Sequence, residues 1–122
     1  MVENRAQKLG HYGEDLARVF LNACGFECLV SRYRKPGGEI DLVMRRDQLL
    51  VFVEVKTRST VGFGLPEEAL TSSQSIRLRR LARHYLYEHS GGGAKEYRFD
   101  LVAVEFGREG NSCQLRHYPG VI

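Results

Sequence analysis

Apolar residues recur at helical spacing in two parts of the chain, residues 4–24 and residues 73–89. In the first segment, one stripe contains Leu9, Gly13, Leu16, Ala17, Phe20, Ala23 and Cys24. In the second, the stripe consists of Leu78, Leu81, Ala82 and Tyr85. Positions spaced i, i+3, i+4 and i+7 are typical of a helix that buries one face. The pattern therefore predicts two amphipathic helices, the first ended by Gly25 and the second by the glycines at 91–93.

The remaining apolar pattern is typical of strands. Segments rich in β-branched and aromatic residues cover 26–34, 39–46, 49–57 and 97–106, and a shorter extended piece covers 114–118. The order helix, three strands, helix, strand predicts an α/β fold in which helices pack on a mixed sheet. The 122 residues contain no repeat and no linker, so we expect a single domain over residues 1–122.

Asp47 and Gln48 separate the second and third strands, and two residues suit a tight hairpin loop. In this register Arg46 faces Leu49. One face of the hairpin then carries only apolar pairs, which are Met44 with Val51, Leu42 with Val53 and Ile40 with Val55. On the other face, the same register places Asp41 opposite Glu54, and Glu39 opposite Lys56.

The predicted pairing of Asp41 with Glu54 suggests a chemical role. Directly opposed side chains have Cβ atoms roughly 4.5–5.5 Å apart, so two carboxylates must share a proton, bind a cation or repel each other. A divalent ion such as Mg²⁺ or Mn²⁺ resolves this conflict, and Lys56 on the same side would orient or activate the attacking water. The alternative is structural, with Glu39 paired to Lys56, and Asp41 paired to Arg45 or Arg58.

The charge pattern permits a nucleic-acid partner without demanding one, because the net charge is only +3. Of 18 basic residues, however, 14 are arginines, whose planar guanidinium groups bind phosphate in bidentate geometry. High genomic G+C content is an equal explanation for this bias. The candidate nucleic-acid-binding residues are Arg34, Arg58, Arg77, Arg79, Arg80 and Arg83. For the four on the second helix, a merely solvated face is the alternative.

Several function classes are excluded or disfavoured by composition. The three cysteines include no C-x-x-C pair, which argues against a disulfide framework or a zinc cluster. No apolar run is long enough to span a membrane, and the N-terminal residues lack the apolar core of a secretory signal. We therefore expect a cytoplasmic protein with no membrane partner. The glycine-containing segment 62–66 is expected to form a flexible loop over the site.

Asp41, followed by Glu54-Val55-Lys56, resembles the D…E-x-K signature of the PD-(D/E)xK nuclease superfamily, whose core also has this order of elements. More specifically, several motifs together resemble the bacterial YraN-like family and span Gly13 to Val102. They are G-E-D-L-A, G-E-I-D-L-V, V-F-V-E-V-K-T-R, F-G-x-P-E-E-A and R-F-D-L-V. One departure is Ile40, which stands where the superfamily motif has proline.

The resemblance implies a restriction-endonuclease-like core (αβββαβ), similar to that of archaeal Holliday junction resolvases. It implies Asp41 and Glu54 as metal ligands, the Val55 carbonyl as a further ligand, Lys56 as the catalytic lysine and Glu14 as an additional carboxylate from the first helix. The expected activity is a Mg²⁺- or Mn²⁺-dependent endonuclease acting on DNA, branched or otherwise structured. By analogy with the resolvases, a homodimer is expected. The alternative is a non-catalytic nucleic-acid-binding module that retains the fold.

Overall fold

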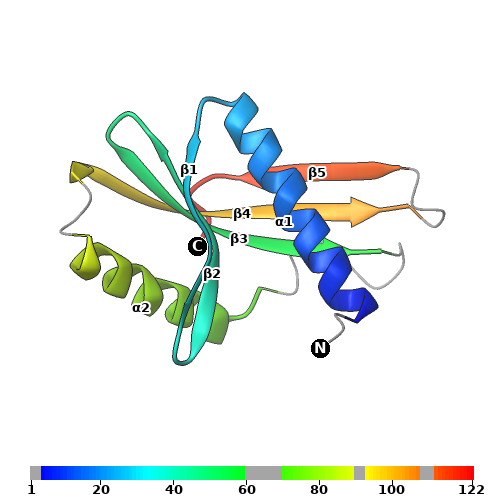
Figure 1. Ribbon diagram of the computed structural model, residues 1–122, viewed down its shortest axis with the longest axis horizontal. Helices are drawn as coiled ribbons and strands as arrows, with labels where there is room; N and C mark the ends of the chain where they lie inside the picture. Colours follow the sequence, from blue (N-terminus) through cyan, green and yellow to red (C-terminus); the bar gives the residue numbers. More distant parts are fainter. Residues whose placement is uncertain (1–3, 60–69, 90–92, 108–111) are drawn as a thin grey trace.

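The computed structural model describes residues 4–59, 70–89, 93–107 and 112–122, and it contains one five-stranded sheet (Figure 1). In chain order the elements are α1 (Arg5–Ala23), β1 (Glu27–Lys35), β2 (Gly38–Arg46), β3 (Leu49–Arg58), α2 (Ser72–Glu88), β4 (Glu96–Phe106) and β5 (Cys113–Tyr118). The strands lie in the order β1-β2-β3-β4-β5, with β3 and β4 parallel and all other neighbours antiparallel. The predicted α/β fold with a mixed sheet is confirmed and is consistent with a restriction-endonuclease-like core. The short extended piece at 114–118 is the edge strand β5.

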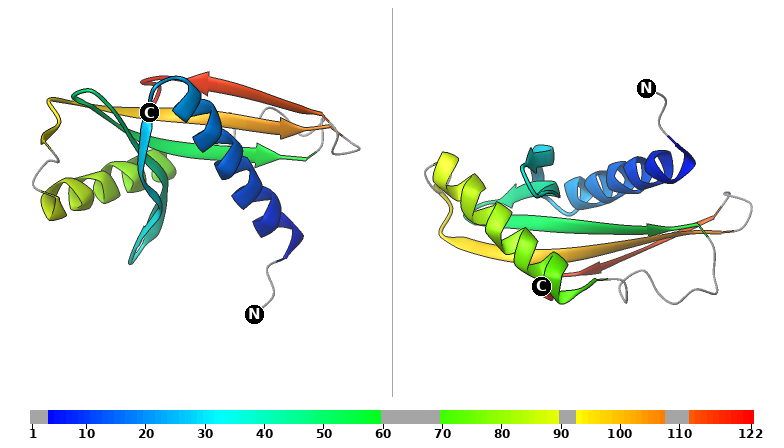
Figure 2. Two further views of the ribbon diagram at one scale, coloured as in Figure 1. Left: turned by 45° about the horizontal axis from the view of Figure 1, so that its top comes forward. Right: turned by 90° about the horizontal axis from the view of Figure 1, so that it is seen from below.

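The two helices cover opposite faces of the sheet (Figure 2). Under α1, the buried cluster includes Ala17, Leu21, Leu42, Met44, Val51, Val53, Val102 and Val104. Under α2, it includes Ile40, Val43, Leu50, Phe52, Leu78, Leu81, Ala82 and Tyr85. Because both faces are covered, the central strands bury apolar side chains on both sides. Any charged group within them therefore occupies a partly desolvated position.

Helix α1 begins with a capping box, in which Asn4 and Gln7 each accept a hydrogen bond from the other's backbone N–H. It packs very closely on β3 at Gly13, where an added Cβ would lie 2.2 Å from the Thr57 Oγ1 atom. The missing side chain thus allows the helix to contact the end of β3. The next residue, Glu14, is thereby placed beside that end of the strand.

Helix α2 also begins with a capping box, formed by Thr71 and Gln74. Its buried residues are Leu78, Leu81, Ala82 and Tyr85, which confirms the predicted apolar stripe. The Tyr85 ring makes edge-to-face contacts with Tyr33 and Phe52, at centroid distances of 5.3 and 5.9 Å. These contacts anchor α2 on β1 and β3, so its outward-facing arginines have a fixed position relative to the sheet.

The hairpin register is confirmed from Arg46–Leu49 to Leu42–Val53, with Asp47 in a left-handed conformation at φ 54°. Beyond Leu42 and Val53 the two strands separate. Figure 1 shows the start of β2 and the end of β3 running in different directions. We call the space between these two strand segments the fork. The expected pairing of Ile40 with Val55 is therefore absent from the register of the described strands.

The prediction that Ile40 shares a face with Leu42 was wrong. Ile40 is opposite Tyr33 on β1 and packs in the cluster under α2, whereas Leu42 packs under α1. The physical reason is a distortion of β1 at Arg32, which has a left-handed φ of 54° and lies between Ser31 and Tyr33, the partners of Leu42 and Ile40. A distorted strand pair does not preserve the simple alternation of faces.

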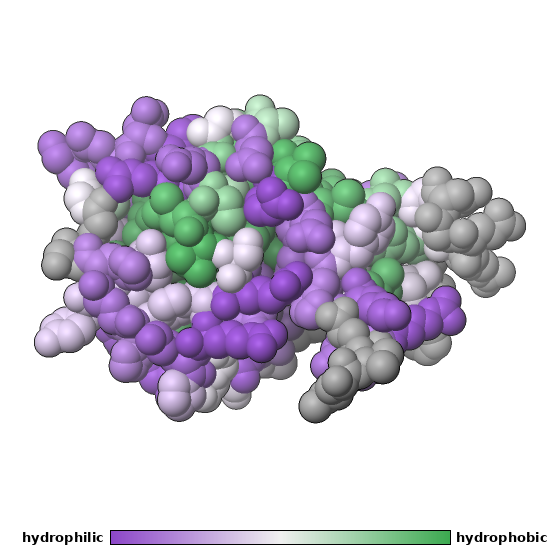
Figure 3. Space-filling model, viewed as in Figure 1, coloured by the Kyte–Doolittle hydropathy of each residue, from purple (hydrophilic) through white to green (hydrophobic). Residues whose placement is uncertain are grey.

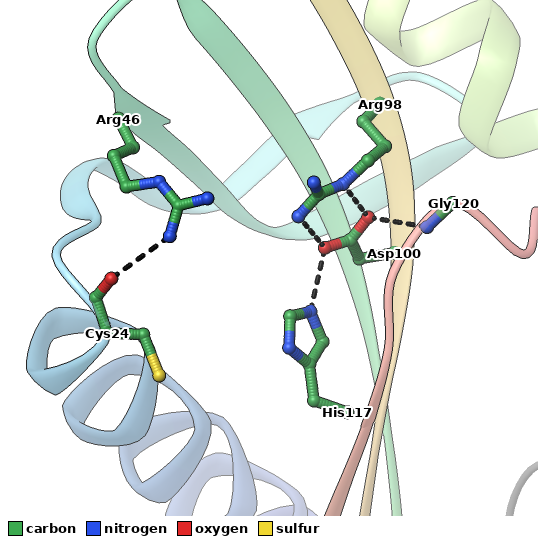
Figure 4. A network of polar contacts seen from close by, with 6 residues as sticks. All are labelled: Cys24, Arg46, Arg98, Asp100, His117 and Gly120. Atoms are coloured by element: carbon green, nitrogen blue, oxygen red, sulfur yellow. Dashed lines mark hydrogen bonds and ion pairs between the residues drawn. The ribbon is translucent and has the colours of Figure 1, made fainter.

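A fully buried carboxylate, Asp100 on β4, ties the sheet to the end of the chain (Figure 4). Its oxygens accept two hydrogen bonds from Arg98, at 2.8 and 2.9 Å, and one from the backbone N–H of Gly120, at 2.9 Å. The His117 Nε2 atom on β5 lies 2.7 Å from it. Nearby, Arg46 donates to the Cys24 carbonyl at 3.1 Å. Asp100 is thus satisfied by protein groups alone, as a structural buried charge requires.

Neither helix of the described residues is both long and apolar enough to cross a membrane. The predicted loop at 62–66 lies outside the described residues.

Candidate functional site

Asp41 lies in the fork, just past the last paired residues of β2 and β3. Its Oδ2 atom accepts a hydrogen bond from the backbone N–H of Val55 at 2.7 Å. The carboxylate therefore binds a backbone group that the neighbouring strand no longer reaches. This bond fixes Asp41 beside β3, although Asp41 and Glu54 are not register partners in the way the simple hairpin predicts.

Three carboxylates converge near this point. One oxygen each from Glu14 on α1 and from Glu39 and Asp41 on β2 lie within 4.8 Å of one another. Burial raises the pKa of Asp41 well above its usual range, and the negative charges of Glu54, Glu14 and Glu39 raise it further. The Val55 N–H only partly offsets these effects. The surroundings thus oppose the ionised form of these crowded carboxylates. A hard divalent cation, which prefers oxygen ligands, would stabilise that ionised form.

Two arginines of β1 hold the outer members of this acidic cluster. Arg32 Nε donates to Glu14 Oε2 at 3.0 Å, and Arg34 Nε donates to Glu39 Oε2 at 2.8 Å. An ionised carboxylate has about four acceptor positions on two oxygens. Each arginine thus orients its partner through one oxygen without using the whole acceptor capacity of the group.

Glu54 and Lys56 form an ion pair on β3, with 3.2 Å between Lys56 Nζ and Glu54 Oε1. Their side chains are only 16% and 18% exposed. Burial raises the pKa of Glu54, while the positive charges of Lys56 and Arg77 act in the opposite direction. The expectation that Lys56 points to the same side as Glu54 is confirmed. The expectation that Glu39 faces Lys56 was wrong, because β1 rather than β3 supplies the partner of Glu39, which is Arg34.

A hollow of about 380 Å³ adjoins the acidic cluster at Glu14, and Val55 and Lys56 of β3 also line it. Its other lining residues are Ala6, Leu9 and Gly10 of α1, and Thr57, Arg58 and Ser59 at the end of β3. Glu14 of the acidic cluster and Lys56 therefore border an open space. Arg58, one of the predicted nucleic-acid-binding residues, lies at the same border.

The predicted arginines of α2 do not act as one group. Arg79 donates to the Ile122 carbonyl at 2.6 Å and stacks on the Phe99 ring at 4.8 Å, which assigns it a packing role. Arg80 donates to the Gly37 carbonyl at 3.4 Å. Arg83 is exposed and borders a surface hollow together with Arg80, His84 and Tyr87. Hydrophilic side chains cover α2 and the hairpin of β1 and β2 in the lower part of Figure 3.

Two members of the site are not among the residues that the sequence singles out for it. Glu39 is two residues before Asp41, and strand alternation places the two on one face, but the predicted register gave Glu39 the wrong partner, Lys56 instead of Arg34. Arg32 carries no such signal, because its role depends on the irregular conformation of β1 and on the position of α1. A lone arginine in a strand does not predict either feature.

Comparison with known proteins assigns the chain to a family. Residues 13–104 match the model described as "Uncharacterised protein family UPF0102". A UPF0102 protein of Beutenbergia cavernae is 48% identical over 113 residues, which cover 93% of this chain and 94% of that protein. One of Rhodococcus opacus is 43% identical, with 89% and 91% covered, and one of Caldicellulosiruptor bescii is 35% identical, with 89% and 92% covered. These matches confirm the family resemblance indicated by the motifs, and the chain belongs to the UPF0102 family.

Proposed function

We propose that this protein is a divalent-metal-dependent endonuclease that hydrolyses phosphodiester bonds in DNA, and that it is a member of the PD-(D/E)xK nuclease superfamily. The observation that carries the proposal is the crowding of Glu14, Glu39 and Asp41 within 4.8 Å, next to the half-buried pair Glu54–Lys56. A structural role alone gives no reason to gather so many carboxylates where burial opposes their ionisation.

Asp41 and Glu54 are the proposed primary ligands of Mg²⁺ or Mn²⁺, and Glu14 and Glu39 add further carboxylate oxygens. Val55 supplies its carbonyl, because the N–H and C=O of a strand residue face the same neighbour and its N–H faces Asp41. When bound, the cation supplies Lewis-acid activation of the phosphate and of the attacking water. The protein's own contribution is to hold these oxygens in place before the substrate arrives.

Lys56 is the proposed catalytic cation of this chain. Its ammonium group lies 3.2 Å from the Glu54 carboxylate and borders the hollow. In phosphodiester hydrolysis, a bond forms from water oxygen to phosphorus while the bond to the leaving oxygen breaks, and negative charge accumulates on the phosphoryl oxygens. A fixed ammonium group beside those oxygens stabilises this charge more in the transition state than in the substrate.

A polyanionic substrate suits the surroundings of the site. The hollow beside the acidic cluster is lined by Lys56 and Arg58, while Arg77 and Arg80 lie on the opposite helix, against the turn that precedes β2. Cations on both sides of an acidic centre attract a phosphate backbone and leave the carboxylates for the metal. Branched or otherwise structured DNA as the substrate, like the homodimer, follows only from the analogy with resolvases.

The test is a cleavage panel with single-stranded, duplex, flapped and four-way DNA, in Mg²⁺, in Mn²⁺ and in chelator. We expect metal-dependent cleavage of at least one substrate by the wild-type protein, and none by Asp41→Asn or Glu54→Gln. Binding of the same DNAs is measured in parallel. Binding without cleavage in either metal would instead favour a non-catalytic nucleic-acid-binding module.

A further inference from the structure

Arg77 differs from the other arginines of α2 in what its side chain contacts. It crosses the start of β2 directly over Gly38, where an added Cβ would lie 2.7 Å from the Arg77 Cδ and 3.1 Å from its Nε. Gly38 has a φ of 157°, and Gly37 beside it has a φ of 97°. The path of Arg77 from the helix toward the fork therefore exists only because position 38 has no side chain.

Arg77 reaches the edge of the proposed metal centre. Gly38, which its side chain crosses, directly precedes Glu39 of the acidic cluster. Arg77 itself is exposed. Unlike Arg79, which is held by Ile122 and Phe99, Arg77 is thus near a candidate metal ligand and also accessible to a substrate.

The electrostatic arrangement around the centre is asymmetric. Glu14, Glu39 and Asp41 crowd together within 4.8 Å of one another. Two cations lie at the border of this group, since Lys56 pairs with Glu54 and Arg77 crosses the strand at Gly38. A divalent cation would be held among the carboxylates, and an anion that contacts this cation would meet the two positive side chains.

We propose that Arg77 is a substrate-binding residue that contacts the phosphate to be cleaved, and that Gly38 is glycine because any side chain there would displace Arg77. This inference rests on the proposed nuclease function and extends it to a specific phosphate contact. A guanidinium group offers paired N–H donors that match two phosphate oxygens. Lys56 approaches from β3 and Arg77 from α2, so the phosphate is held from two elements.

The experiment compares Arg77→Ala and Arg77→Lys with Arg83→Ala, an exposed arginine of the same helix. Binding of a labelled four-way junction is measured in Ca²⁺ and in chelator, and Mn²⁺ affinity is measured by calorimetry without DNA. Arg77→Ala is expected to lose about tenfold in DNA affinity in Ca²⁺ and much less in chelator, since only a metal-held phosphate lies within its reach. Arg77→Lys should recover part of the loss. For Arg83→Ala, the loss of DNA affinity should be equal in Ca²⁺ and in chelator.

Mn²⁺ affinity without DNA separates a substrate contact from a structural role. Removing a cation near Glu54 should leave Mn²⁺ binding unchanged or make it tighter, while DNA binding weakens. Gly38→Ala should reproduce the DNA-binding loss of Arg77→Ala, and the double variant should lose no more than either single variant. Gly25→Ala, which also strains a positive φ but lies at the end of α1, controls for backbone strain.

Each outcome has a definite meaning. If Arg77→Ala loses the same factor in Ca²⁺ and in chelator, as Arg83→Ala does, Arg77 belongs only to the general basic surface. The inference is then wrong, while the metal centre stands. If Mn²⁺ binding weakens in Arg77→Ala, its role is structural and the inference is also wrong. If the wild-type protein binds no Mn²⁺, the proposed function itself fails.

Discussion

The backbone N–H of Val55 donates a 2.7 Å hydrogen bond to the carboxylate of Asp41, at the point where β2 and β3 cease to pair. The bond takes the place of the strand-to-strand hydrogen bond that the divergence of the two strands removes. It also holds Asp41 where the charge of Glu54 acts on it. A single hydrogen bond therefore both replaces the lost strand pairing and positions the Asp41 carboxylate.

Asp41→Asn is expected to stabilise the metal-free protein at neutral pH. The folded-state pKa of Asp41 is raised above its ordinary value of 3.8, chiefly by burial. The wild-type protein therefore loses stability as pH rises from that value through the raised one. Asparagine still accepts the Val55 hydrogen bond but carries no charge. Thermal unfolding in chelator, measured from pH 4 to pH 8, should show an advantage for Asp41→Asn that grows with pH.

The control for that variant is Asp47→Asn, an exposed turn residue whose left-handed φ asparagine tolerates well. It should follow the wild-type stability profile. A metal-free Asp41→Asn protein that is less stable than wild type at pH 8 would mean that Asp41 is not electrostatically strained.

Divalent metal should stabilise the wild-type protein, because an ion that binds only the folded state raises its stability by mass action. At an ion concentration 100 times the dissociation constant, the gain is about 2.7 kcal/mol. Asp41→Asn and Glu54→Gln should each remove most of the gain. Differential scanning fluorimetry in Mn²⁺ and in chelator measures this stabilisation as a shift in Tm. Equal shifts in the wild type and in both variants would rule out this metal site.

Two substitutions at Arg32 separate its conformational role from its ion pair with Glu14. Both Arg32→Ala and Arg32→Gly remove the 3.0 Å contact to Glu14, so each should weaken Mn²⁺ binding by roughly tenfold. Glycine tolerates a φ of 54°, so Arg32→Gly should be the more stable of the two by about 1 kcal/mol. Calorimetry and denaturant unfolding measure the two effects.

Lys95→Ala, which removes a surface cation, serves as the control for the Arg32 pair and should bind Mn²⁺ as the wild type does. Unchanged Mn²⁺ affinity in both Arg32 variants would show that Glu14 needs no anchor or takes no part in metal binding.

Asp100→Asn should destabilise the protein without affecting metal binding. Although burial acts to raise the pKa of Asp100, hydrogen bonds from Arg98, Gly120 and His117 bring it below its usual range. The stability that Asp100 contributes is therefore present at neutral pH and is lost as pH falls through its folded-state pKa. Breaking a buried ion pair typically costs 3–5 kcal/mol, so we expect a loss of about 3 kcal/mol in urea unfolding at pH 7. A loss below about 1 kcal/mol there, or one that grows as the pH falls, would contradict the assigned role.

The parts of the fold that local rules determine were predictable from the sequence. The helix stripe around Leu81 follows from periodicity, and the register from Arg46–Leu49 to Leu42–Val53 follows from a two-residue loop with alternating apolar positions. Each of these features depends on residues that are close together in the chain.

The predictions that were wrong concern features that depend on contacts between distant segments of the chain. Ile40 changes face because Arg32, on a different strand, adopts a left-handed conformation that arginine has no intrinsic preference for. Glu39 pairs with Arg34 instead of Lys56 because at this end of β2 the neighbouring strand is β1, not β3. The separate roles of Arg77 and Arg79 likewise depend on Gly38 and on the end of the chain. A helical charge pattern contains no information about either.

The most direct test of the account is single-turnover cleavage of a labelled four-way junction and a plain duplex by wild type, Lys56→Ala and Lys95→Ala. DNA binding is measured in Ca²⁺, and Mg²⁺ is kept saturating so that the pKa of Glu54, which Lys56 lowers, does not limit the rate. We predict that the wild-type protein and Lys95→Ala cleave in Mg²⁺, and that Lys56→Ala binds DNA nearly as tightly but cleaves about 10²-fold more slowly or worse. A wild-type protein that binds both DNAs and cleaves neither in Mg²⁺ or Mn²⁺, or a Lys56→Ala variant that cleaves at the wild-type rate, would contradict the account.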